Sequence, residues 1–60
     1  MDVVTEYSKL LNIYLRLSQI SDNLNNLTTS KEIDISDIKI NEAKFWLNKR
    51  LEYLKTFNNI

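Results

Sequence analysis

Apolar side chains recur at steps of three and four residues through the first half of the chain. The main row consists of Val3, Tyr7, Leu10, Tyr14, Leu17 and Leu24, and it is widened by Ile13, Ile20 and Leu27. An α-helix turns about once every 3.6 residues, so this spacing predicts one amphipathic helix over about residues 2–27. Val4, Leu11 and Leu15 lie roughly 100° or more away from that row on a helical wheel. They form a second apolar strip that one partner helix cannot cover.

The helical pattern stops near the middle of the chain. Residues 25–29 read Asn-Asn-Leu-Thr-Thr, in which Asn takes the place of the C-terminal Gly of a helix and Thr is a poor helix former. We therefore predict a turn at about residues 25–30. The next helix is expected to start near Thr29 or Ser30, because Thr29 and Glu32 have the Thr-x-x-Glu spacing of a capping box.

A second helix is predicted over about residues 30–57. Its main row consists of Ile40, Ala43, Leu47, Leu51 and Leu54, and a separate aromatic strip beside it consists of Ile35, Trp46, Tyr53 and Phe57. Residues 32–40 alternate like a strand and are rich in β-branched residues. A lone strand would have nothing to pair with, so we assign them to the first turns of the helix. Two long helices joined by a short turn predict an antiparallel hairpin that forms one domain over residues 1–60.

Each predicted helix has two apolar faces, which a single hairpin cannot bury. A chain of 60 residues builds only a thin core. The sequence contains no Cys and no His, so neither a disulfide nor a zinc site is available to stabilise it. We therefore expect an all-α hairpin that assembles into a homo-oligomeric helical bundle, from dimer to hexamer. The expected interface residues are Leu11, Leu15, Trp46, Tyr53 and Phe57.

The charge balance narrows the classes of partner. Eight basic residues match eight acidic ones, so the chain lacks the basic excess of proteins that bind duplex nucleic acid or lie on a membrane surface. The N-terminus carries acidic residues and leads into no uninterrupted apolar run, so we expect neither a signal peptide nor a transmembrane span. The expected location is the cytoplasm.

The composition also argues against catalysis. Without His and Cys the commonest acid-base and nucleophilic groups are missing, and two helices offer no water-excluding pocket. We therefore expect neither an enzyme nor a cofactor. The carboxylates of Asp34, Asp37 and Glu42 are conceivable metal ligands, but acidic groups near a helix start more often complement the helix dipole. No metal site is predicted.

Two sets of residues have a functional and a structural interpretation. Trp46 and Tyr53 lie seven residues apart on one helical face with Arg50 between them. They would serve either as a platform on which a base stacks or as anchors buried against another protomer, and we favour the second role. Lys31 and Lys39, near the turn, would either contact phosphates or belong to a solvated face.

Residues 30–46 resemble a known family. They read Ser-Lys-Glu-Ile-Asp-Ile-Ser-Asp-Ile-Lys-Ile-Asn-Glu-Ala-Lys-Phe-Trp. This stretch is similar to the second-helix signature of the phage anti-CBASS and anti-Thoeris sponge proteins that share a helical hairpin domain. That signature reads Ser-Arg-Glu, an apolar residue three positions further on, and a run ending in Glu-Ala-Lys/Arg-Met-Trp. The matching residues are Ser30, Glu32, Ile35, Glu42, Ala43, Lys44 and Trp46. Lys31 takes the place of Arg, and Phe45 takes the place of Met.

The resemblance implies a phage protein for immune evasion, which binds cyclic nucleotide signals in the host bacterial cytoplasm and sequesters them as a multimer without degrading them. On this interpretation Ser30, Lys31 and Lys39 contact the phosphates. The alternative is a small phage or bacterial interaction protein that docks an apolar helical face on a host protein. A third possibility is a structural or regulatory helical dimer without a ligand.

Overall fold

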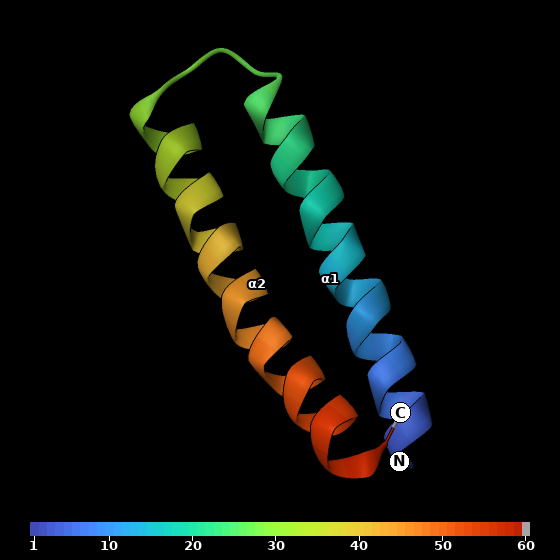
Figure 1. Cartoon of the computed structure of the whole chain (residues 1–60). Coiled ribbons are helices and arrows are strands. Elements are labelled where there is room, and N and C mark those ends of the chain that lie inside the picture. Colours follow the sequence, from blue (N-terminus) through green and yellow to red (C-terminus); the bar gives the residue numbers. More distant parts are fainter. Residues whose placement is uncertain (60) are drawn as a thin grey trace.

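The computed structural model describes residues 1–59 and contains two antiparallel helices, α1 (Val3–Asn25) and α2 (Lys31–Asn58). The turn lies at one end of the hairpin and both chain termini lie at the other (Figure 1). The hairpin measures 42 × 15 × 14 Å. The predicted all-α hairpin is confirmed. The observed helix bounds differ by one or two residues from the predicted ranges of about 2–27 and 30–57.

Each helix begins with a side-chain cap. Asp2 accepts hydrogen bonds from the backbone N–H and the hydroxyl of Thr5, at 2.8 and 2.9 Å. The Ser30 hydroxyl oxygen accepts from the Ile33 N–H at 3.2 Å. Such caps satisfy N–H groups that have no partner within the helix. The capping box predicted from Thr29 is not formed, because the cap is Ser30 and the third helical position holds Ile33, which has no polar group to reach back.

The turn is closed by backbone hydrogen bonds at the end of α1. The Asn26 N–H donates to the Asn23 carbonyl at 3.2 Å, and the Leu27 N–H donates to the Leu24 carbonyl at 3.1 Å. Asn26 has a right-handed backbone, with φ −90° and ψ −3°. The C-terminus of α1 therefore does not use the left-handed conformation for which Asn replaces Gly. That conformation occurs instead at Asn59, the C-cap of α2, with φ 56°.

The two helices meet along a heptad seam, in which positions are spaced alternately by four and three residues as in a coiled coil. The seam residues of α1 are Val3, Tyr7, Leu10, Tyr14, Leu17, Ser21 and Leu24, and those of α2 are Ile33, Asp37, Ile40, Lys44, Leu47, Leu51 and Leu54. All of them are at least partly buried. Among the described residues only Leu51, Leu54 and Ser21 are buried outright. The hydrophobic core is therefore as thin as a chain of this size predicts.

Two polar contacts cross the seam and define its register. The Ser21 hydroxyl donates to the Asp37 carboxylate at 2.5 Å, and the Lys44 ammonium lies over the Tyr14 ring, 5.2 Å from its centroid. Tyr14 was predicted as part of the main row, whereas Ser21, Asp37 and Lys44 were not, because the predicted rows contain apolar residues only. The row predicted for the second helix includes Ala43, which is exposed. The seam position next to it is held by Lys44.

Much of the apolar surface lies outside the seam. Ile13, Ile20 and Leu27, which were predicted to widen the main row, are exposed because they flank the seam on one side. The accessible surface of the hairpin is 4708 Å². A compact protein of 7.1 kDa is expected to have roughly 4,100 Å². A single hairpin therefore leaves apolar surface available for a partner.

Candidate binding surfaces

The three residues predicted to contact phosphates lie in the first part of α2. Ser30 is the N-cap, and its hydroxyl hydrogen remains free to donate after the oxygen has accepted from Ile33. Lys31 is the next residue and is exposed. Lys39 is also exposed, and its Nζ lies 3.9 Å from a carboxylate oxygen of Glu42. The structure thus brings Ser30 and Lys31 together at the turn, while Lys39 lies about 12 Å further along the helix.

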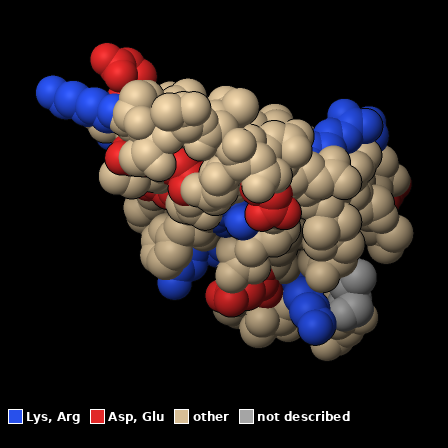
Figure 2. Space-filling view, turned by 90° about the horizontal axis from the view of Figure 1, so that it is seen from above, with Lys and Arg blue, Asp and Glu red and all other residues tan. Residues whose placement is uncertain are grey.

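The turn end of the hairpin presents separate charges and no basic cleft. In the view onto this end, basic and acidic side chains are dispersed among uncharged ones (Figure 2). Among residues 1–59 no three potential ligand side chains come together to hold a metal ion. Neither described helix is long and apolar enough to cross a membrane. The turn end of one hairpin therefore offers separate cations to a phosphate ligand (Figure 2).

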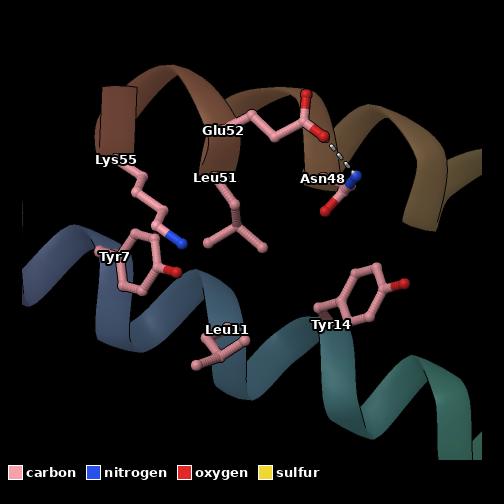
Figure 3. Close-up of a pocket in the computed structure, with 7 residues that line it drawn as sticks. All are labelled: Tyr7, Leu11, Tyr14, Asn48, Leu51, Glu52 and Lys55. Atoms are coloured by element: carbon pink, nitrogen blue, oxygen red, sulfur yellow. Dashed lines mark hydrogen bonds between the residues drawn. The ribbon is translucent and has the colours of Figure 1, made fainter. Parts of the chain in front are cut away.

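A pocket lies between the helices in the half of the hairpin that carries the chain ends (Figure 3). It is lined by Tyr7, Leu11 and Tyr14 from α1 and by Asn48, Leu51, Glu52 and Lys55 from α2. The Asn48 amide donates to the Glu52 carboxylate at 3.1 Å. The volume is about 230 Å³, below the roughly 300–1,000 Å³ of pockets that enclose small ligands. The pocket has room for a ring or a side chain and is too small for a cyclic dinucleotide.

None of the predicted phosphate contacts lines this pocket, and its polar rim was not anticipated. Asn48, Glu52 and Lys55 are spaced by four and three residues, so they follow one side of α2 beside the seam. On α1, Leu11 lies on the side that faces this row and lines the same pocket. This juxtaposition depends on the register of the two helices, which the apolar pattern alone does not give.

The opposite side of the seam carries a set of exposed apolar side chains, which we call the aromatic face. It consists of Ile13, Ile20, Trp46, Tyr53 and Phe57. Arg50 donates to the two carboxylate oxygens of Glu6 at 2.9 and 3.2 Å, so these residues face each other across that side of the seam. Ile13 and Ile20 follow Glu6 at steps of seven residues on α1. Trp46, Tyr53 and Phe57 flank Arg50 on α2.

The aromatic face is exposed in the single chain. Trp46 is 64% exposed, Tyr53 51% and Phe57 70%. The Tyr53 and Phe57 rings lie 4.9 Å apart, and the Arg50 guanidinium lies 5.3 Å from the centre of the Tyr53 ring. The expectation that Trp46 is buried between helices is therefore not met within one hairpin. Its burial would require a second molecule.

The predicted interface residues fall on two sides of the hairpin. Trp46, Tyr53 and Phe57 belong to the aromatic face, whereas Leu11 lines the pocket on the opposite side, and Leu15 follows Leu11 by one helical turn. All five are exposed. A single contact with one partner cannot cover both sides.

The ion pair beside the aromatic face changes the titration of its members. The hydrogen bonds from Arg50 lower the pKa of Glu6 below its ordinary value, and the same bonds raise the pKa of Arg50. Both groups therefore stay charged near neutral pH. Because the Arg50 guanidinium and the Glu6 carboxylate pair with each other, their charges are neutralised within the chain.

No protein-family model matches this chain, and comparisons with curated proteins and with solved structures found no similar protein. Function is therefore inferred from the motif at residues 30–46 and from the geometry of the hairpin.

Proposed function

We propose that this protein acts by binding and not by catalysis, and that several copies assemble to sequester a cyclic oligonucleotide signal without degrading it. The observation that carries the proposal is the exposed apolar surface on two sides of the hairpin, where Trp46 and Phe57 on the aromatic face and Leu15 on the pocket side are each more than half exposed. Contiguous apolar patches on small soluble proteins mark interaction sites. A sequestering protein needs a pre-formed site and no reactive group.

Assembly also supports the choice of ligand. The pocket of one hairpin is too small for a cyclic oligonucleotide, and the cations at its turn are isolated. A symmetric oligomer repeats Lys31 and the N-terminus of α2 once in every copy. A cyclic oligonucleotide repeats its phosphates around a ring, so repeated cations and helix N-termini match repeated anionic groups. The similarity of residues 30–46 to the sponge signature favours this ligand class over other anions.

A second candidate function is docking on a host protein, and the aromatic face favours it. Trp46, Tyr53 and Arg50 lie together on that face, and these three residue types dominate the binding energy of protein interfaces. The two functions differ in one property. A sponge binds a small ligand by itself, whereas a docking protein binds none until its partner is present.

The proposal is tested by thermal unfolding and calorimetry of the parent chain with cyclic dinucleotides, cyclic trinucleotides and cyclic ADP-ribose species. A ligand that binds only the folded assembly stabilises it by about 2.7 kcal/mol at a concentration one hundred times its dissociation constant. We expect at least one of these compounds to raise the unfolding temperature. No response to any of them would contradict the sponge function and favour docking.

Variants of Lys31 test the predicted site. Lys31→Glu should abolish nucleotide binding because it places like charges together, and Lys31→Arg should bind at least as well because a guanidinium contacts phosphate through two donors. Both should leave helicity unchanged, since the residue is exposed in the first turn. Lys9→Glu is the matched control, because Lys9 is an exposed lysine near the other end of the hairpin. Equal affinities of the parent and Lys31→Glu would remove Lys31 from the site.

A further inference from the structure

The aromatic face has the properties of a surface that pairs with itself. It runs across both helices, with Ile13 and Ile20 on α1 and the three aromatic residues on α2. Arg50 lies over the Tyr53 ring and is already paired with Glu6 by two hydrogen bonds. A buried charge is costly unless it is paired. A partner that covers Tyr53 and Phe57 therefore does not have to supply a complementary charge for Arg50.

We infer that a second copy of this chain covers the aromatic face around a two-fold axis, so that two hairpins form a four-helix bundle with the pockets on its outer sides. This inference specifies the self-association on which the proposed function rests. In a two-fold interface the same patch occurs on both subunits. The aromatic face meets that condition around Tyr53 and Phe57, because its copy presents the same rings and an Arg50 that is already paired with Glu6.

The available area agrees with a dimer. An aromatic side chain buries about 150–250 Å², so the exposed parts of Trp46, Tyr53 and Phe57 amount to roughly 370 Å². The two isoleucines, 45% and 46% exposed, raise the apolar area to roughly 550 Å² per copy. Two copies together would bury roughly 1,100 Å² before the flanking side chains are counted. Stable interfaces start at about 1,200 Å², and the flanking residues supply the difference.

The other side of the hairpin is less suited to this contact. There the seam is bordered by Asn48, Glu52 and Lys55, whose polar groups line the pocket. Covering them would bury polar atoms that now face water, at a cost unless each found a partner. Four helices also provide a core that two do not, because the aromatic face of each helix pair becomes interior. The dimer therefore compensates for a seam in which, among residues 1–59, Leu51 and Leu54 are the only buried apolar residues.

The only tryptophan of the chain makes the inference directly measurable. In the parent at micromolar concentration, the fluorescence of Trp46 should be blue-shifted, as in an apolar environment, and should shift to the red on dilution through dissociation of the dimer. Sedimentation under the same conditions should give at least two copies. A folded monomer, or an oligomer whose tryptophan emits as in water, would overturn the inference.

Matched variants locate the contact. Phe57→Glu should raise the dimer dissociation constant at least a hundredfold, because it places a charge in each half of the apolar interface. Ile38→Glu makes the same change at an exposed isoleucine of α2 outside the aromatic face, and it should leave Trp46 fluorescence and dimer formation unchanged. Equal effects of the two variants would overturn the inference. If the Phe57→Glu variant unfolds, the dilution experiment on the parent still tests whether the dimer buries Trp46.

These results separate the inference from the proposed function. A dimer with a buried Trp46 that binds no cyclic nucleotide would support the inference and contradict the sponge function. An assembly that binds nucleotide while Trp46 remains in water would support the sponge function and overturn this interface.

Discussion

The hydrogen bond between Ser21 and Asp37 is the polar contact on which the seam depends most, and Ser21→Ala tests it. The Ser21 side chain is only 6% exposed and donates to the Asp37 carboxylate. A hydrogen bond to a charged group contributes about 1.5–3 kcal/mol to stability. Asp37 is partly exposed, so water replaces part of the lost contact. We therefore expect Ser21→Ala to lower the free energy of unfolding by about 1.5 kcal/mol, at the low end of that range.

A double-mutant cycle with Asp37→Ala isolates the contact. The free energies of unfolding should be measured by urea denaturation, followed by circular dichroism at one protomer concentration, because the stability of a self-associating protein depends on concentration. The expected coupling between Ser21 and Asp37 is about 1 kcal/mol. Additive effects, or a Ser21→Ala variant as stable as the parent, would refute the argument. Asp37→Leu in the Ser21→Ala background should recover stability, because it makes this layer of the seam apolar.

Two further predictions concern charge and capping. Hydrogen bonds from Arg50 hold the pKa of Glu6 below its ordinary value of 4.5, so the stability from this pair is present above that pH and lost as the pH falls through the lower pKa of the folded state. In urea denaturation, acidification should lower the free energy of unfolding less in Glu6→Gln than in the parent. Equal decreases in the two proteins would contradict the role of the pair. Ser30→Ala should lower the free energy of unfolding by about 1 kcal/mol, whereas Ser30→Asp should retain it because Asp is an equally good N-cap. If Ser30→Asp is as destabilised as Ser30→Ala, the side chain is not acting as a cap.

The helices themselves follow from the spacing of apolar residues. Residues 32–40 alternate like a strand, yet of the four isoleucines in this segment only Ile33 and Ile40 enter the seam, while Ile35 and Ile38 are exposed. The helical assignment was correct because the neighbouring segment supplied a helix to pack against and no strand. Where a segment fits both the helical and the strand spacing of apolar residues, the structure of the segment it packs against decides which of the two forms.

The seam could be predicted only in part. The apolar row of α1 continues past Ser21 to Leu24, and Lys44 and Asp37 lie between apolar positions of α2. A search for apolar residues passes over these polar positions. Their burial becomes favourable only through partners on the other helix, which the register supplies. A heptad template applied without regard to polarity would have found them.

The candidate surfaces were harder to predict than the helices. An apolar row at helical spacing does not reveal whether it packs within the chain or against another molecule, and Trp46 illustrates this ambiguity. Ser30 was predicted as a phosphate contact, and the structure also gives it a local role as the cap of α2. Serine is a preferred N-cap residue, so the sequence already contained a signal for that role of Ser30. The pocket requires the pairing of Leu11 with Lys55 from the far end of the chain, which no local pattern contains.

We propose that the protein binds a cyclic nucleotide as an assembly of several copies. Sedimentation velocity of the parent chain with a panel of cyclic oligonucleotides, followed at a wavelength where nucleobases absorb, tests both parts at once. We predict that the absorbance of at least one compound moves with a protein boundary of two or more copies. A protein that sediments as a folded monomer, with every nucleotide left behind in the solvent, would contradict the account.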